Sequence, residues 1–383
     1  MNHRTLANWV WRAVAAGVLA GVGGLQLIQL AIETRTAAGE AVVDMAFSPD
    51  GKDLATASEY NAVYFWKLAG AELPKVFSLP RHVPVSVRFT GEGNRIITGA
   101  HGFLKGSWTV KSARIDIWNP DTAICERTVD IPGGYVGDVE CASPNVAVAV
   151  LKGSVARYDL ETGQTLERID LPADAASHLC RAPDGRFLVY GSPASTRRVN
   201  VWDSVRREFL FDQDDTMVLV HEVAMSPDCR MVAACGRASG RMGRLSVWNL
   251  ADGRELGVPF AVPELFRVAF TPDGKSVLAT NMQGRINVWN ISDAGYLDFD
   301  REFAADGRVE RLVFSPDGSR VAMVTSTSLS IYDYATGDKL QTLVEPLRLY
   351  SFRRVVRWSK FLLVIAAGIA MIWSLRHRIV RRT

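Results

Sequence analysis

The sequence predicts an all-β fold of seven repeated units, each a small sheet of four antiparallel strands, with a transmembrane helix on either side of the repeats. Two observations support this prediction. A turn signature and a strand that ends in an aromatic residue recur through residues 41–345, and uncharged apolar stretches occur near both ends of the chain. The 383 residues contain 22% charged and 48% apolar residues, which excludes a disordered chain.

The turn signature is Ser-Pro-Asp-Gly or a close variant. It occurs at 48–51, 182–185, 226–228, 271–274 and 315–318, with degenerate copies at 90–93 and 143–144. Proline at the second position and glycine at the fourth fit a type I turn, and the aspartate can accept local backbone hydrogen bonds. The second landmark is the aromatic residue that closes an alternating strand, found at Trp66, Trp118, Tyr158, Trp202, Trp248, Trp289 and Tyr332. The mean spacing of these blade-closing aromatics is about 44 residues, which indicates a structural repeat.

The sixth unit shows the order of elements within one repeat. Strands are expected at 266–270, 276–279 and 285–289, with the turn signature between the first two and a further turn at 292–295. One such sheet cannot bury both of its faces. Seven sheets packed face to face around an axis can, so the repeats predict a seven-bladed β-propeller over 41–345.

The repeat resembles the WD40 family in its period, its Ser-Pro-Asp-Gly turn and its closing tryptophan. The Trp-Asp pair itself occurs only at 202–203, and the Gly-His dipeptide of the family is missing from every unit. The resemblance therefore implies that the hydrogen-bonded tetrad built on that histidine is largely absent. It also implies that the first strand of each blade lies innermost, and that the chain binds other proteins and has no chemistry of its own.

The two ends of the chain predict membrane attachment. At the N-terminal end we expect a tail at 1–12, a transmembrane helix at 13–32 and a linker at 33–40. At the C-terminal end we expect a basic amphipathic interfacial segment at 346–360, a second transmembrane helix at 361–375 and a basic tail at 376–383. The basic residues of the interfacial segment are Arg353, Arg357 and Lys360. A cleaved signal peptide is the alternative for the first stretch, and a buried helix for the second. We expect an integral protein of the cell membrane. The basic residues that flank the two spans are balanced between the two sides; those of the first span alone slightly favour an extracytoplasmic propeller, and the five cysteines weakly favour the opposite side.

The upper face of the propeller is the face that carries the loops between second and third strands. These loops are predicted at 99–114, 151–154, 191–198, 236–244, 281–285 and 325–328, and no acidic residue occurs in them. The linker between the first span and the propeller is short, so we expect the upper face to lie towards the membrane, where its basic residues would meet anionic headgroups. The alternative is that these are ordinary loop charges in contact with solvent. The basic residues that form this prediction are Lys105, Lys111, Arg114, Arg197, Arg198, Arg237, Arg241, Arg244 and Arg285.

Motifs for catalysis and cofactor binding are absent from the sequence. The six histidines are scattered, and the five cysteines form no CxxC pair, so we expect no catalytic residue, no metal and no cofactor. A net charge of +3 does not favour a nucleic-acid partner. The expected function is a membrane-anchored scaffold or accessory subunit that binds other proteins, including membrane proteins, and membrane lipid. The alternative is a propeller hydrolase or ligand sensor with a site in the central channel.

Overall fold

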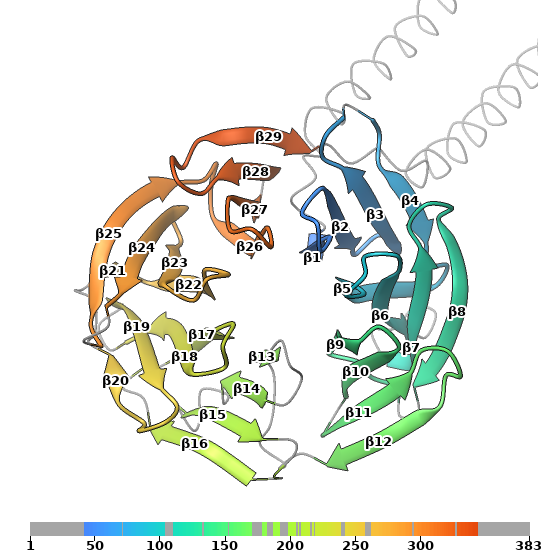
Figure 1. Ribbon diagram of the computed structural model, residues 1–383, viewed down its shortest axis with the longest axis horizontal. Helices are drawn as coiled ribbons and strands as arrows, with labels where there is room; N and C mark the ends of the chain where they lie inside the picture. The colour runs from blue at the N-terminus through green and yellow to red at the C-terminus, as the bar shows by residue number, and fades with distance from the viewer. Residues whose placement is uncertain are drawn as a thin grey trace, which may run out of the picture. The chain divides into compact units, whose positions relative to one another are not determined.

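The computed structural model describes seven antiparallel sheets arranged around a central axis (Figure 1). The residues that it describes are 42–70, 72–103, 110–131, 134–151, 153–170, 178–181, 187–191, 198–203, 206, 208–214, 217, 219–238, 242–256, 262–292, 295–325 and 328–343. Within these residues no helix is long and apolar enough to cross a membrane. The predicted tails, linker, spans and interfacial segment, at 1–40 and 346–383, lie outside the described residues.

The first three blades use the N-terminal strands. Blade 1 contains β1 (Val42–Phe47), β2 (Asp53–Ser58), β3 (Ala62–Lys67) and β4 (Lys75–Ser78). Blade 2 contains β5 (His82–Phe89), β6 (Ile96–Phe103), β7 (Val110–Asn119) and β8 (Ile124–Ile131). Blade 3 contains β9 (Asp138–Ser143), β10 (Val146–Leu151), β11 (Ser154–Asp159) and β12 (Thr165–Asp170).

The other four blades complete the ring. Blade 4 contains β13 (His178–Arg181), β14 (Phe187–Gly191), β15 (Arg198–Asp203) and β16 (Glu208–Asp214). Blade 5 contains β17 (Leu219–Met225), β18 (Met231–Arg237), β19 (Met242–Asn249), β20 (Glu255–Leu256) and β21 (Val262–Pro263). Blade 6 contains β22 (Leu265–Phe270), β23 (Ser276–Asn281), β24 (Arg285–Ile291) and β25 (Leu297–Ala304). Blade 7 contains β26 (Val309–Phe314), β27 (Arg320–Thr325), β28 (Leu329–Asp333) and β29 (Lys339–Leu343).

Strands that are consecutive in the sequence pair as neighbours in every sheet except that of blade 5, and the first strand of each blade lies nearest the central axis (Figure 1). This confirms the prediction of an all-β propeller of antiparallel blades. Blade 5 departs from the four-stranded pattern because both β20 and β21 pair with β19. The antiparallel order puts the turns between second and third strands, and the links between blades, on the same upper face.

The predicted turns at 48–51, 226–229, 271–274 and 315–318 form as their sequence predicts, and the turn at 182–185 lies outside the described residues. In blade 1 the Gly51 amide donates to the Ser48 carbonyl at 2.8 Å, and the Ser48 hydroxyl donates to Asp50 at 2.7 Å. Hydrogen bonds from the Ser315 and Ser319 side chains lower the pKa of Asp317, in the blade 7 turn, to about 2. The fourth turn residue has a positive φ, 69° at Gly51. Cys229 takes the same place in blade 5 with a φ of 58°, where glycine is normally favoured.

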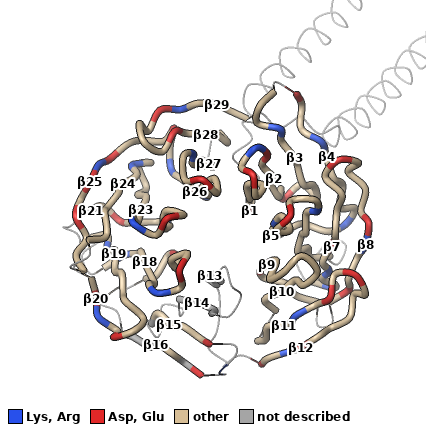
Figure 2. Tube along the Cα trace, viewed as in Figure 1, with Lys and Arg blue, Asp and Glu red and all other residues tan. Residues whose placement is uncertain are grey.

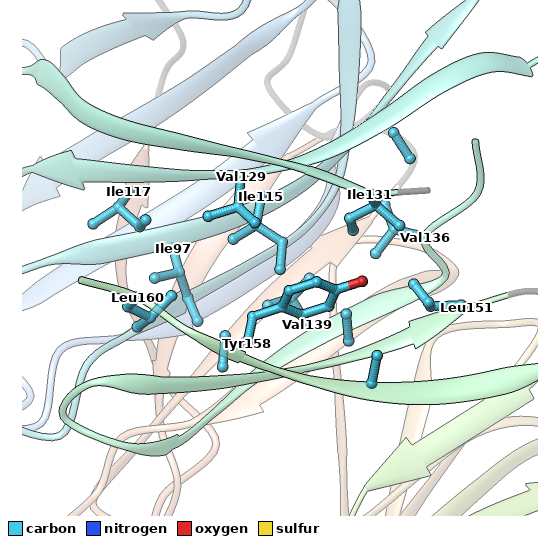
Figure 3. Close-up of a cluster of buried hydrophobic side chains, with 14 residues drawn as sticks. Ile97, Ile115, Ile117, Val129, Ile131, Val136, Val139, Leu151, Tyr158 and Leu160 are labelled. Carbon is cyan, nitrogen blue, oxygen red and sulfur yellow. The ribbon is translucent and has the colours of Figure 1, made fainter. Parts of the chain in front are cut away.

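The blade-closing aromatics lie on the third strands and pack against the preceding blade. Figure 3 shows Tyr158 of blade 3 among Ile97, Ile115 and Val129 of blade 2. Trp118 in turn stacks on Phe77 of blade 1, with ring centroids 5.6 Å apart. These side chains fill the space between sheets, which is why an aromatic residue recurs once in each repeat.

The closing tryptophans of two blades form a side-chain hydrogen bond, although the histidine-based tetrad was expected to be largely absent. Trp66 Nε1 donates to Thr56 Oγ1, and Trp118 Nε1 donates to Thr98 Oγ1, each at 3.1 Å. The other closing aromatics have no threonine at the corresponding position of the second strand; Ala279 stands there in blade 6. These two hydrogen bonds join the second and third strands within one blade.

Among the residues that the structure describes, the blade 7 sheet contains β26 to β29, and no strand from another part of the chain joins it. Trp66 and Tyr64 of blade 1 pack against apolar residues of blade 7, among them Ile331. Arg311 Nε of blade 7 also donates to the Val43 carbonyl of blade 1 at 2.9 Å. The joint between the first and last blades thus resembles the other joints in its side-chain packing.

Candidate interaction surface

An aromatic and charged cluster joins blades 5, 6 and 7 on the upper face. The imidazole of His221, on β17, stacks on the ring of Phe266, on β22, with centroids 4.3 Å apart and planes at 19°. The Arg308 guanidinium, in the link before β26, lies 5.3 Å from the Phe266 centroid. Phe266 is therefore flanked by a side chain from each neighbouring blade. We call this set the blade 5–7 cluster; it consists of His221, Arg237, Glu264, Phe266, Met282, Arg308 and Glu310.

The positions of this cluster depend on an irregularity that recurs in the innermost strands. The pairing of β17 with β18 shifts between Val220 and Glu222, so His221 is left out of the ladder. The same shift leaves out Phe266 in β22 and Glu310 in β26. A residue at such a bulge is released from strict alternation, and its side chain can be re-aimed. All three residues stand five positions before the serine or threonine of the following turn.

The charges of the blade 5–7 cluster are paired with one another. His221 Nε2 lies 2.9 Å from Glu264 Oε1, and Arg237 Nε lies 3.9 Å from the same oxygen. Arg308 Nε donates to Glu310 at 2.6 Å. Met282, in the turn between β23 and β24, is 41% exposed, and its sulfur lies 3.8 Å from Arg308 Nη1. The cluster thus offers apolar and aromatic surface among charges that already have partners.

A second charged group joins blades 1, 2 and 3 at their innermost strands. The Arg88 guanidinium, on β5, pairs with Asp44 of β1 and with Glu140 of β9, and its Nη2 lies 3.4 Å from Asp138 Oδ1. We call these four residues the Arg88 clamp. Burial raises the pKa of Asp138 to about 7, although the positive charge of Arg88 opposes this. The clamp holds three blades together and carries more negative than positive groups.

Inner-strand carboxylates also bond directly to the next blade. Asp44 accepts a hydrogen bond from the Val87 amide, and Glu222 accepts one from the Val268 amide, both at 2.9 Å. Arg311 occupies the corresponding position in blade 7, four residues before the turn serine, and donates to blade 1. These contacts account for the charged residues on the otherwise apolar inner strands.

The loops of the upper face are shorter than the sequence predicts. The predicted loop 99–114 is mostly strand, since β6 extends to Phe103 and β7 begins at Val110. Lys111 and Arg114 therefore lie on β7, Arg198 on β15, Arg237 at the end of β18, and Arg244 and Arg285 on β19 and β24. Lys105, Arg197 and Arg241 lie outside the described residues, and the structure describes no side chain for Arg198.

Four of these basic residues, Arg114, Arg237, Arg244 and Arg285, have acidic partners that the loop sequences do not reveal. Arg244 lies 2.9 Å from Glu255, Arg285 lies 3.0 Å from Glu302, and Arg114 lies 2.8 Å from Asp116. Glu255 and Glu302 come from neighbouring strands of the same blades, and Asp116 lies on β7 itself, two residues after Arg114. Acidic and basic positions are interspersed around the ring (Figure 2). This arrangement reduces the one-signed field expected from the loops, and membrane contact of these residues remains a prediction.

Sequence reasoning found the repeat but missed the blade 5–7 cluster. The position five residues before each turn can be counted in the sequence. That its side chain leaves the ladder follows from the bulge, and the bulge is known only once the strand pairing is known. Within the described ranges, no group of three or more histidine, cysteine, aspartate or glutamate residues is arranged to hold a metal ion.

Comparison with known proteins supports the repeat. Residues 32–67 match the family model described as WD domain, G-beta repeat. The chain is 28% identical over 222 residues to WD repeat-containing protein 3 of Homo sapiens, covering 54% of this chain and 23% of that protein. It is 26% identical over 200 residues to an uncharacterized WD repeat-containing protein of Deinococcus radiodurans, covering 46% of this chain and 76% of that protein. The chain therefore spans about a quarter of the length of the human relative.

A solved structure shows the same fold. A chain in the crystal structure of a mitotic checkpoint complex superposes with a TM-score of 0.61 at 19% identity, covering 77% of this chain and 90% of that chain. At this level of identity the likeness concerns the fold alone.

Proposed function

We propose that this chain is a WD40-type propeller that acts as a scaffold, and that it binds another protein through the blade 5–7 cluster. The observation that carries the proposal is the stack of His221, Phe266 and Arg308 across three blades beside the exposed Met282. Aromatic residues, methionine and arginine are enriched in protein interfaces. Residues on a rigid ring also lose little conformational entropy when a partner binds.

Charge pairing favours a protein partner over anionic lipid at this surface. Binding to a lipid headgroup needs basic side chains whose charge is available, whereas Arg237, Arg244 and Arg308 each lie against a carboxylate. A protein surface can cover such internally paired groups while it contacts Phe266 and Met282. Lipid contact is thereby left to the terminal segments.

We further propose that the terminal segments anchor the scaffold in a membrane. The support is the sequence itself: the uncharged stretches at 13–32 and 361–375 and the basic segment at 346–360. The partners of such a protein would include membrane proteins, and the chain would be an accessory or assembly subunit of a membrane complex. Extraction of native membranes with carbonate tests this directly, because a soluble chain would be released and an anchored one retained. The hydrolase or ligand-sensor alternative stays a prediction from fold analogy.

The binding proposal is tested by affinity capture of the full-length chain in mild detergent with quantitative mass spectrometry. Met282→Lys places a charge in the blade 5–7 cluster. Leu340→Lys makes the same kind of change at a 55% exposed residue on the outer strand of blade 7 and serves as the matched control. We expect specific partners to be recovered with the wild type and Leu340→Lys but reduced about tenfold with Met282→Lys. Equal recovery with both variants would contradict the proposal.

A further inference from the structure

The lower face of the propeller carries the turns between first and second strands, and neighbouring turns lie against one another. The proline of one turn approaches the glycine of the next. An added Cβ at Gly51 would lie 3.5 Å from Pro316 Cδ of blade 7. In the same way, an added Cβ at Gly93 would lie 3.1 Å from Pro49 Cδ of blade 1. The junction of blades 7 and 1 and the junction of blades 1 and 2 are therefore built alike.

At the junction of blades 7 and 1, an arginine fills the space between the two turns. Arg320 stands five residues after the turn serine of blade 7, and its Nη2 donates to the Gly51 carbonyl of blade 1. Its guanidinium lies 5.8 Å from the ring centroid of Phe47, the residue directly before the turn of blade 1. This junction thus shows how a guanidinium is held between two blades, by a turn carbonyl and an aromatic ring.

The junction of blades 1 and 2 has an acidic residue at the position of that arginine. Asp53 stands five residues after the turn serine of blade 1, as Arg320 does in blade 7. By alternation it lies on the same side of β2 as Ala55 and Ala57, which pack against blade 2. An aspartate side chain is shorter than an arginine, and a cavity of about 360 Å³ lies between the turns. We call this cavity the Asp53 groove; it is lined by Ser48, Pro49, Asp50, Asp53, Glu92 and Gly93.

The other groups that hold the guanidinium recur at the Asp53 groove. Gly93 occupies the place of Gly51 in its turn, and Phe89 stands directly before that turn, as the stacked phenylalanine does in blade 1. An added Cβ at Gly51 would lie 3.3 Å from Arg320 Nη2, whereas no atom of Asp53 lies within 4 Å of the same point at Gly93. The groove therefore has the carbonyl and the ring but no cation from its own blade.

The charged residues that line the Asp53 groove are all acidic, and one of them is unpaired. Asp50 lies 3.3 Å from Lys52, and Asn94 donates to Glu92 at 2.8 Å. The Asp53 carboxylate has no ion pair within the part of the chain that the structure describes. Burial, together with the charge of Asp50, raises the pKa of Asp53. A cation bound in the groove would compensate this carboxylate.

We propose that the Asp53 groove binds an arginine side chain of a partner protein. The guanidinium pairs with Asp53, donates to the Gly93 carbonyl and lies beside the Phe89 ring. Arginine fits better than lysine, because its planar fork can bond two acceptors and stack on a ring, whereas an ammonium group is a point charge. The groove lies on the face opposite to the blade 5–7 cluster, so it is a contact separate from the proposed scaffold surface.

The test is binding of short peptides to the full-length chain, immobilised in detergent, by surface plasmon resonance. The peptides are pentapeptides blocked at both ends, with arginine, lysine or citrulline between glycines; citrulline has the shape of arginine without its charge. We expect the arginine peptide to bind at least about fivefold more tightly than either of the others. Equal binding of the arginine and lysine peptides would overturn the proposal, because the contact would then be charge attraction alone.

Variants of the chain locate the site. Asp53→Asn should weaken binding of the arginine peptide at least about fivefold. Glu59→Gln removes the same charge at an exposed residue beyond the other end of β2 and should leave binding unchanged. Asp53→Arg copies the junction of blades 7 and 1, so its own guanidinium should fill the groove and abolish binding.

Two results with these variants would overturn the proposal. One is an equal effect of Asp53→Asn and Glu59→Gln, which would place the peptide elsewhere. The other is undiminished binding to Asp53→Arg, since the groove would then be filled without excluding the peptide. Met282→Lys, on the upper face, should not affect the peptide, so this inference and the proposed scaffold surface can fail separately.

Discussion

Removing the guanidinium of the Arg88 clamp should destabilise the propeller in a pH-dependent way. Arg88→Met keeps most of the aliphatic volume but leaves Asp44, Asp138 and Glu140 facing one another. Breaking a buried ion pair from one side costs about 3–5 kcal/mol. The Arg88 side chain is 23% exposed, and water can partly solvate the carboxylates, so we expect the lower end, about 3 kcal/mol, at pH 8.

The assay is urea unfolding followed by tryptophan fluorescence at pH 8 and pH 5. At pH 5 the loss should shrink, because Asp138, whose pKa burial raises to about 7, takes up a proton there and its repulsion of the other two carboxylates is relieved. Arg95→Met is the matched control, since Arg95 pairs with Glu126 at 3.1 Å on the surface of the same blade and should contribute less than about 1 kcal/mol. A loss for Arg88→Met that equals that of the control, or that is the same at both pH values, would refute the reasoning.

Two further substitutions probe the contacts between blades. Because burial raises the pKa of Asp138 from 3.8 to about 7, the folded state holds a proton that the unfolded chain releases, and this residue lowers the unfolding free energy as the pH rises from about 4 to about 7. Asp138→Asn should flatten that dependence and raise stability at pH 8; an unchanged pH profile in urea titrations would count against the assignment. Tyr158→Ala should cost about 3–5 kcal/mol by opening a cavity between blades 2 and 3, measured by the same unfolding method. Tyr296→Ala, at a 57% exposed position, should cost far less, and comparable losses would argue against Tyr158 as a packing residue.

The sequence predicted the strands closely because their signals are local. In the sixth unit the expected strands at 266–270, 276–279 and 285–289 fall within β22, β23 and β24. The loops of the upper face were predicted too long, since β6 and β7 continue past the point where glycines and lysines suggest a loop. A strand pair can extend wherever its ladder is satisfied, and the sequence of one strand does not show where its partner ends.

The amino-acid sequence by itself determined the number of blades, the positions of the turns that the structure describes and the aromatic residue that each repeat places between sheets. These features follow from short-range chemistry: proline and glycine set the turn, and alternation sets the strand. Only the tertiary structure decided which charges meet and which side chains leave the ladder. Arg88 meets carboxylates from two other blades, 44 and 52 residues away, and Phe266 contacts His221 because a bulge re-aims both. Such contacts depend on strand register and on closure of the ring, which bring together residues that no local pattern connects.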